Sequence, residues 1–337
     1  MPVRLAPNQP RHFYRGGAAL ARFRGLPQAS PFTPEDWVGS TVSRFGTDDV
    51  GLTRLDDGRF LRDALAADPL PFLGAAHLAR SGADPGVLVK LLDPGQRIPV
   101  HAHPDRAFAA RHLGLGHGKT EAWIVLEVRD PDACVYLGFR ESVRREDLRT
   151  WVREQDVARL LGALNGMPVA PGSAFFVPAG VPHAIGAGLL LLELQEPTDL
   201  SVLMEWKDLA VDGRADGHLG LGFDLALECV DRSALRGDRL ESLWRGRRSA
   251  PAEGIERVFP APVDAFFRAE WIGVDPAVEL DPAYAILVVL SGAGSLIPDG
   301  SPAVRVHRGD TLLIPFAAGR CRIEGRLQAI RCLPPVG

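Results

Sequence analysis

The sequence predicts a mainly β protein built from two jelly-roll β-barrels with a small helical insertion. Short apolar runs bounded by Gly and Pro recur along the chain, which is the spacing of an all-β protein. A glycine followed by five residues and a proline occurs at 172–178 and again at 309–315, so the pattern repeats after 309 minus 172, or 137, residues. An amphipathic helical pattern at about 142–165 supplies the insertion.

The predicted elements follow in chain order. Residues 1–60 are rich in Gly, Pro and Arg and are expected to form irregular structure with short strands that covers a barrel. Helical spacing is found at 61–67 and 71–80. Apolar runs predict strands at 87–92, 123–128, 133–139, 173–177 and 188–195.

The insertion is expected to contain two helices. Ser142 is a candidate N-cap for the first, and the second is expected to begin at Asp156. The insertion is either a wall or lid of a functional site or a plug at the side of the barrel. After residue 250, short strands and turns are predicted at 285–290, 292–296, 304–307 and 309–315.

Two motifs point to a metal site. On an extended strand His101 and His103 project to the same side, so their imidazoles can converge on one point. The pair alone is equally compatible with two surface imidazoles on an edge strand. Downstream, the turn that begins at Gly172 and runs through Pro178 and Pro182 leads to His183. Such a turn between apolar strands can aim a side chain into a barrel mouth, and imidazoles with a carboxylate suit a divalent cation.

The two motifs, in this order, resemble the bipartite signature of the cupin superfamily. Within it, the chain resembles the type I phosphomannose isomerase (mannose-6-phosphate isomerase) family in its short bacterial form. The similarity lies in the segments 103–105, 108–109, 118–123, 176–185 and 193–196, and in a turn at 15–17 with Arg in place of the family's Trp. The resemblance implies two cupin barrels and a zinc-dependent aldose-ketose isomerase that converts mannose 6-phosphate into fructose 6-phosphate.

The predicted metal ligands are His101, His103, Glu121 and His183. The family places Gln at the position of His101, so this site would be richer in nitrogen. We therefore expect a divalent metal, with zinc implied by the resemblance and Mn, Fe, Co or Ni as alternatives. The catalytic candidates are Lys119 and Glu193. Lys119 lies two residues before Glu121 and could act as acid, base or oxyanion clamp, or only hold the neighbouring carboxylate.

Glu193 is expected to carry the proton or to orient the group that does, whereas the alternative is a strand carboxylate paired with Arg. The substrate-binding candidates are Lys90, Trp123 and Lys207. Lys90 interrupts an apolar run, so it either points into the barrel towards a polar substrate or extends its ammonium to water from a strand edge.

One position departs from the family. The family has an Arg a few residues after its Glu-Ile-Gln run, where it assists catalysis and binds substrate, and the aligned residue here is Leu203. An apolar side chain cannot replace a guanidinium. An isomerase or epimerase of a non-phosphorylated or oxidised sugar, a cupin metalloenzyme such as a dioxygenase, and a non-catalytic sugar-binding protein therefore remain alternatives.

Composition and charge argue against nucleic acid and membranes as partners, and the family resemblance implies a small-molecule sugar or sugar phosphate. A formal net charge of −4 gives no basic footprint for nucleic acid, and no apolar run is long enough to cross a membrane. Four widely spaced cysteines are typical of reduced thiols in a cytoplasmic protein. We predict a metal-binding catalytic domain at 1–245 and a degenerate second barrel without metal ligands at 250–337. The sequence leaves the oligomeric state open.

Overall fold

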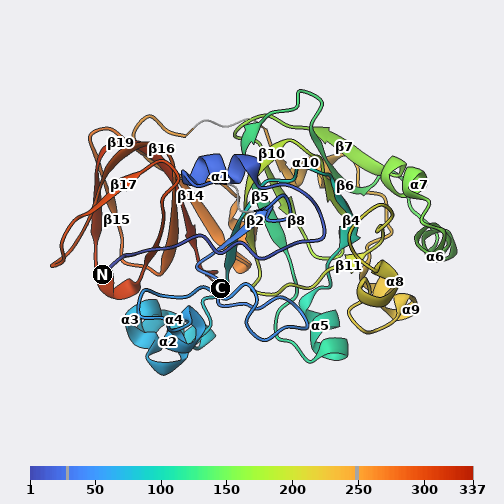
Figure 1. The fold of residues 1–337 in the computed structure, drawn as a ribbon, viewed down its shortest axis with the longest axis horizontal. Coiled ribbons are helices and arrows are strands. Elements are labelled where there is room, and N and C mark those ends of the chain that lie inside the picture. The colour runs from blue at the N-terminus through green and yellow to red at the C-terminus, as the bar shows by residue number, and fades with distance from the viewer. Residues whose placement is uncertain (28–29, 247–249, 337) are drawn as a thin grey trace.

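The computed structural model describes residues 1–27, 30–246 and 250–336, and over these residues it contains three β-sheets (Figure 1). The six-stranded sheet has the order β12 (Trp244–Arg245), β8 (Ala174–Val177), β5 (Glu121–Val128), β10 (Leu189–Gln195), β3 (Leu88–Leu92) and β2 (Glu35–Val38). The five-stranded sheet has the order β11 (Val202–Leu203), β4 (Ile98–Ala102), β9 (His183–Ile185), β6 (Cys134–Phe139) and β7 (Leu164–Pro168). The mainly β prediction is confirmed.

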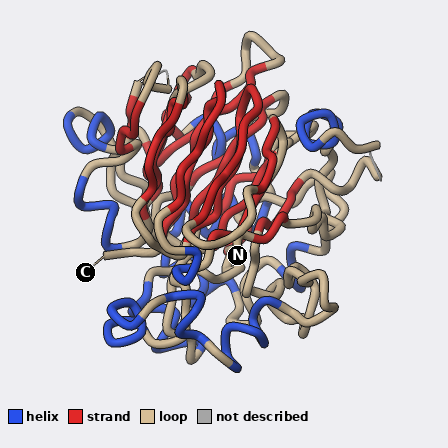
Figure 2. Tube along the Cα trace, turned by 90° about the vertical axis from the view of Figure 1, so that its left-hand side faces the viewer, coloured by secondary structure: helices blue, strands red, loops and turns tan. Residues whose placement is uncertain are grey.

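The eight-stranded sheet forms the second barrel, whose strands lie side by side in Figure 2. Its path runs β1 (Val3–Arg4), β18 (Thr311–Ile314), β16 (Ala285–Pro298), β19 (Cys321–Leu333), β14 (Arg268–Val274) and β13 (Gly254–Arg257), while β15 (Ala277–Leu280) pairs with β19 and β17 (Val304–His307) with β16. The strands predicted at 285–290 and 292–296 are one long strand, because β16 passes through a register irregularity between Val289 and Ser291 without ending.

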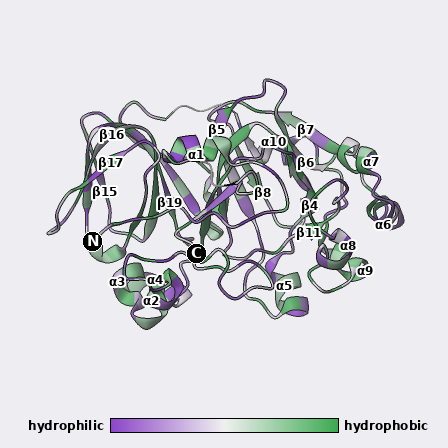
Figure 3. Cartoon of the chain, viewed as in Figure 1, coloured by the Kyte–Doolittle hydropathy of each residue, from purple (hydrophilic) through white to green (hydrophobic). Residues whose placement is uncertain are grey.

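Alternation along β10 explains how the sheets are layered. Leu190, Leu192 and Leu194 pack against the second barrel in a shared apolar core. Leu189 and Leu191 point the other way and pack against residues of the five-stranded sheet. Because successive strand residues face opposite sides, Glu193 shares the side of Leu189 and Leu191 and therefore faces the interior of the first barrel. Figure 3 shows hydrophobic residues along the strands of both barrels.

The repeated Gly and Pro pattern forms the same turn in both barrels. Gly172 has φ 89° before β8, and Gly309 has φ 90° before β18. A Cβ at position 309 would lie 2.0 Å from the carbonyl oxygen of Phe23, so only glycine fits there. The interior of the second barrel is filled by apolar side chains, including Leu287, Leu312 and Ile323. The second barrel therefore packs against the first through the shared apolar core.

The N-terminal segment is more regular than its composition suggests. It contains α1 (Ala18–Arg24), whose first turn donates backbone N–H groups to the carboxylate of Asp93. The predicted helix at 61–67 is confirmed as α2 (Leu61–Ala67). The one expected at 71–80 is divided into α3 (Pro69–Leu73) and α4 (Ala75–Ser81), because Gly74 adopts φ 77° between them. The remaining helices are α5 (Arg106–Leu113), α8 (Gly213–Asp216), α9 (Phe223–Ala226), α10 (Asp238–Ser242) and the short 3-10 turns η1 (Leu227–Cys229), η2 (Ala261–Ala265) and η3 (Phe316–Ala318).

The predicted insertion is present as α6 (Arg145–Glu154) and α7 (Val157–Gly162). Asp156 caps α7 by accepting from the N–H of Arg159, but the Ser142 cap is wrong, because α6 begins at Arg145 and the Ser142 hydroxyl instead accepts from the N–H of Ala234. Both helices pack on apolar residues at the outside of the five-stranded sheet, at the edge of the molecule in Figure 1. Of the two alternatives for the insertion, this position agrees with a plug at the side of the barrel.

The division into domains at 1–245 and 250–337 stays a prediction. Its boundary includes 247–249, which lie outside the described residues. The sheet of the second barrel also takes in β1 from the N-terminus, since Val3 and Arg4 pair with Leu313 and Leu312. None of the helices in the described part of the chain combines the length and the apolar character that a membrane crossing requires.

Candidate metal centre and catalytic site

Three histidines meet between the two sheets of the first barrel. His101 on β4 lies opposite His183 on β9, and the two ring centroids are 4.1 Å apart. His103, directly after β4, places its ring 4.9 Å from His101 and 4.8 Å from His183. One ligand nitrogen from each residue lies within 4.8 Å of the others, and all three side chains are buried. The predicted convergence of the two motifs is therefore what the fold produces.

The outer nitrogen of each ring is held by a backbone carbonyl. Nδ1 of His101 lies 2.8 Å from the oxygen of Pro99, and Nδ1 of His183 lies 2.9 Å from that of Val181. Nδ1 of His103 is 2.7 Å from the carbonyl of Leu200. A carbonyl oxygen can only accept, so each Nδ1 carries the proton and each Nε2 presents a lone pair. This is the tautomer that a metal-binding imidazole requires.

Glu121, at the start of β5, faces these lone pairs from the opposite sheet. Its two carboxylate oxygens lie 3.0 Å from Nε2 of His103 and 3.2 Å from Nε2 of His183. Nitrogen lone pairs and a carboxylate repel each other when no proton lies between them, so a cation at this point would stabilise the arrangement. Nε2 of His183 is buried without a hydrogen-bond partner among the described residues. The residues present therefore fit a divalent cation held by three imidazoles and one carboxylate.

The protonation of these groups agrees with that role. Burial, together with the ammonium of Lys119, lowers the pKa of His103 to about 3, so its ring is neutral at physiological pH. Burial alone would raise the pKa of Glu121, but the nearby ammonium of Lys119 holds it well below its usual range. Neutral imidazoles beside an ionised carboxylate are the forms that bind metal.

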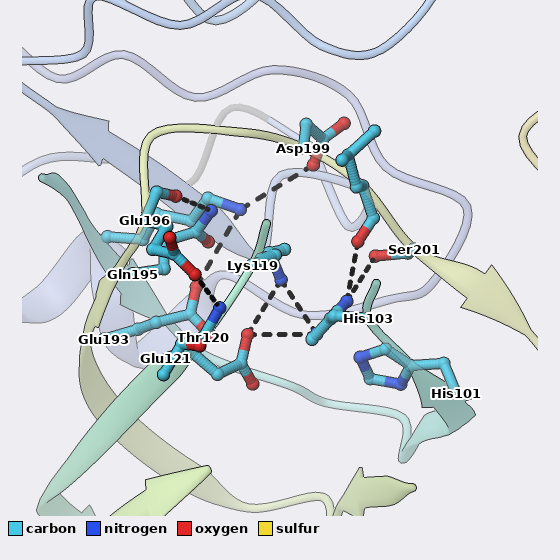
Figure 4. A network of polar contacts seen from close by, with 12 residues as sticks. His101, His103, Lys119, Thr120, Glu121, Glu193, Gln195, Glu196, Asp199 and Ser201 are labelled. Carbon is cyan, nitrogen blue, oxygen red and sulfur yellow. Dashed lines mark hydrogen bonds and ion pairs between the residues drawn. The ribbon is translucent and has the colours of Figure 1, made fainter. Parts of the chain in front are cut away.

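Lys119 is the nearest cation to this group. Its Nζ donates to Glu121 at 2.8 Å and lies 3.1 Å from Nε2 of His103, as Figure 4 shows. Its backbone N–H donates to the carbonyl of Pro104, which fixes the residue just before β5. Lys119 thus holds the carboxylate of Glu121, which is one of the two roles expected from the sequence. It also lines the cavity described below, as a catalytic role would require.

A row of polar and aromatic side chains crosses the six-stranded sheet beside the metal ligands. Lys90 on β3 pairs in register with Glu193 on β10, which pairs with Trp123 on β5. Trp123 Nε1 donates to Glu121 at 2.9 Å and to Glu193 at 3.3 Å. Burial and the nearby charge of Glu121 raise the pKa of Glu193 to about 7. The carboxyl of Glu193 can therefore both take up and release a proton near neutral pH.

Lys90 is buried, so it does not extend to water at a strand edge. Its Nζ lies 3.4 Å from Glu35, 3.8 Å from Glu193 and 3.9 Å from Asp199, and 4.3 Å from the ring centroid of Trp37. Although burial opposes the charged form, Glu35 and Glu193 raise the pKa of Lys90 above its usual value. Lys90 remains an ammonium that organises carboxylates around the floor of the barrel.

An open cavity of about 400 Å³ leads from the surface to this floor. Among the predicted residues, its lining includes Lys90, His101, Lys119, Glu121 and Glu193. The remaining predicted residues lie outside the lining: His103, His183 and Trp123 are buried behind it, and Lys207 is exposed elsewhere on the surface.

Leu203 lines the cavity next to the metal ligands, since it pairs in register with His101. Leu203, which the sequence comparison predicted to stand in place of an Arg, therefore faces the cavity with an apolar side chain. No residue of α6 or α7 belongs to the lining found among the described residues, so the insertion is not a wall or lid of this cavity.

Sequence reasoning missed the contribution of the N-terminal segment. Glu35 lines the cavity and accepts from the hydroxyl of Tyr14 at 2.5 Å and from Nε1 of Trp37 at 2.8 Å. Nε2 of His12 lies 3.3 Å from the same carboxylate, and burial lowers the pKa of His12. Hydrogen bonds and cations around Glu35 hold its pKa below the usual range despite burial. The only sequence signal was a cluster of aromatics in a Gly- and Pro-rich segment, which does not show what they contact.

The comparisons with known proteins agree with the resemblance seen in the motifs. No protein-family model matches the sequence. The chain is 26% identical over 324 residues to a mannose-6-phosphate isomerase of Bacillus subtilis, covering 94% of this chain and 93% of the relative. A crystal structure of mannose 6-phosphate isomerase from Bacillus subtilis superposes with a TM-score of 0.77 at 22% identity, covering 98% of this chain and 99% of that one. A mannose 6-phosphate isomerase bound with zinc and yttrium gives a TM-score of 0.72 at 16% identity, covering 99% and 100%. The resemblance to this family and the cupin fold are confirmed.

Proposed function

We propose that this chain, a relative of the mannose-6-phosphate isomerases in sequence and fold, is a metal-dependent aldose-ketose isomerase that interconverts mannose 6-phosphate and fructose 6-phosphate. One observation carries the proposal. Three imidazoles with free Nε2 lone pairs converge with Glu121 at the floor of an open cavity, and Lys119 lies within hydrogen-bond distance of the same group.

His101, His103, Glu121 and His183 would hold the cation. When bound, it would supply a Lewis acid that stabilises negative charge on the carbonyl and hydroxyl oxygens of the open-chain sugar. We propose zinc, supported by the zinc-bound structural neighbour and by the imidazole-rich ligand set. Mn, Fe, Co and Ni are the alternatives that metal analysis of the purified protein would distinguish.

Glu193 and Lys119 are proposed to move and hold the proton. Both line the cavity: Glu193 lies on β10, and Lys119 directly precedes the neighbouring strand β5. Glu193 takes the proton from C2 of the open-chain aldose and returns it to C1, while the hydroxyl proton on O2 passes to O1, so that the aldose becomes the ketose through an enediol. The Lys119 ammonium donates to the oxygen on which negative charge develops.

Proton NMR of the metal-loaded protein in deuterated water tests the proposal. Mannose 6-phosphate is expected to convert to fructose 6-phosphate with deuterium incorporation, and His183→Ala is expected to show no conversion. Unphosphorylated mannose is run in parallel, because Leu203 removes the family's guanidinium from the site. Absence of turnover of the phosphate ester with metal bound would contradict the assignment and redirect it to neutral or oxidised sugars.

We also propose a cytoplasmic location. All four cysteines are free in the structure, and two of them, Cys321 and Cys332, are buried in the second barrel. Unpaired thiols are typical of a reducing compartment.

A further inference from the structure

Two arginines at the mouth of the cavity have no acidic partner. Arg11 and Arg44 both line it, and no carboxylate of the described residues lies within ion-pair distance of either guanidinium. In contrast, the cationic groups deeper in the cavity, Lys90 and Lys119, are both paired with glutamates. The uncompensated positive charge of this cavity is therefore confined to its mouth.

Both guanidiniums are held in place by uncharged contacts. Arg44 donates to the backbone carbonyl of Arg11 at 2.6 Å. Arg11 lies over the ring of Phe32, 4.7 Å from its centroid. These contacts orient the two side chains without neutralising them, which keeps their charge available for a ligand.

A chain of contacts connects Glu121 with the segment that carries Arg44. Glu121 shares the indole N–H of Trp123 with Glu193, and Lys90 connects Glu193 to Asp199. Asp199 in turn accepts from the backbone N–H of Phe45, the exposed residue that follows Arg44. A path of polar contacts thus connects the candidate metal centre with the backbone next to Arg44, and both ends of this path line the same cavity.

We propose that Arg11 and Arg44 form a clamp for the phosphate monoester at the end of the sugar remote from the reacting carbons. The proposal rests on the isomerase function proposed above and deepens it. A phosphate dianion matches two guanidiniums in charge and in donor geometry. The clamp accounts for how a phosphorylated substrate is held although Leu203 occupies the position next to His101.

None of the carboxylates in the described lining forms an ion pair with Arg11 or Arg44. Asp199 shares the ammonium of Lys90 with Glu35 and Glu193, and Asp216 is an exposed residue on the short helix α8. Asp216→Asn would remove one negative charge from the lining. We expect it to tighten binding of the phosphate ester and to leave binding of the neutral sugar unchanged.

The test compares phosphorylated with unphosphorylated sugar on the metal-loaded protein. In Arg44→Leu and Arg11→Leu, the KM and the calorimetric Kd for mannose 6-phosphate are each expected to rise about tenfold relative to those for mannose. Arg44→Lys, which keeps the charge, is expected to recover part of this selectivity. Arg111→Leu, on the exposed face of α5 and without an ion pair in the described structure, is the matched control and should change nothing.

The two readouts separate failure of the clamp from failure of the proposed reaction. If the unaltered protein binds mannose 6-phosphate but turns over neither sugar, the isomerase assignment fails, and the Kd values still decide the clamp. If both Leu variants retain the selectivity of the unaltered protein for the phosphate ester, the clamp is overturned. Arg11 is exposed, so its variant provides the answer even if Arg44→Leu does not fold.

Discussion

His101 and His183 form a register pair across β4 and β9, and their rings approach to 4.1 Å between centroids. Nδ1 of each ring donates to the carbonyl of the residue two positions earlier, which leaves Nε2 of each ring free, and Nε2 of His183 lies 3.2 Å from Glu121. The strand pairing and these local hydrogen bonds together fix two of the predicted metal ligands before any cation binds.

His183→Ala is expected to remove the metal and the activity together. Loss of one of four ligands should lower metal occupancy to near zero after dialysis, and turnover by more than about 100-fold. Plasma emission spectrometry of the purified variant measures the first effect. His218→Ala is the control, because His218 contacts Gly222 and lies outside the cavity lining. A fully metal-loaded His183→Ala protein would contradict the ligand assignment.

Lys119→Met is expected to lower kcat by about 10²- to 10⁴-fold, the range of a missing proton-transfer group. The metal content should be retained, because none of the four proposed ligands is removed. Lys207→Met removes the same charge from an exposed position outside the cavity and should leave kcat unchanged. Steady-state kinetics on both variants with matched metal content decides the question. Equal losses in the two variants would place the effect outside the site.

Trp123→Phe should weaken metal binding although the indole is not a ligand. The variant loses the N–H donor shared by Glu121 and Glu193, so affinity is expected to fall about 10- to 100-fold. Competition with a chromophoric chelator measures the affinity. Trp271→Phe is a matched control, because Trp271 is buried in the second barrel and its Nε1 has no hydrogen-bond partner in the described structure. Unchanged affinity in Trp123→Phe would show that the ligand orientation does not depend on the indole.

Stability is expected to fall between neutral and alkaline pH through His117. A hydrogen bond from His117 to Asp84 and the nearby carboxylate of Glu196 raise the pKa of this histidine to about 9 in the folded protein, against about 6.5 in the unfolded chain. The folded state therefore binds the proton more tightly, so the stabilisation is complete below pH 6.5 and is lost as the pH rises through 9. Because the side chain is partly exposed, we expect a loss of only about 1 kcal/mol in the free energy of unfolding.

Urea unfolding at pH 6, 8 and 10 measures this effect. His117→Gln should remove the difference attributed to this residue and flatten the pH dependence by the same amount. If the free energy of unfolding of His117→Gln falls with pH as steeply as that of the unaltered protein, groups other than His117 cause the effect.

The local sequence pattern was sufficient to predict the strands and helices in which apolar residues recur with a clear period. The apolar run around Lys90 is a buried strand, the helix at 61–67 has the predicted bounds, and the spacing of His101, His103 and His183 did predict a cluster. These features follow from side-chain alternation and from turn residues that act over a few positions. The helix at 71–80 was predicted as one because a single glycine inside a helical pattern does not by itself reveal the break at Gly74.

By itself, the sequence determined the β class, the repeated turn and the three histidines that converge, because these depend on residue type and short-range spacing. Only the tertiary structure decided which side chains line the cavity. It brought Glu35 and the arginines at 11 and 44 to the cavity, buried Trp123 behind Glu121, and left Lys207 outside. The physical reason is that these positions depend on long-range pairing of strands and on an irregular segment held by side-chain hydrogen bonds, and neither leaves a periodic signal in the chain.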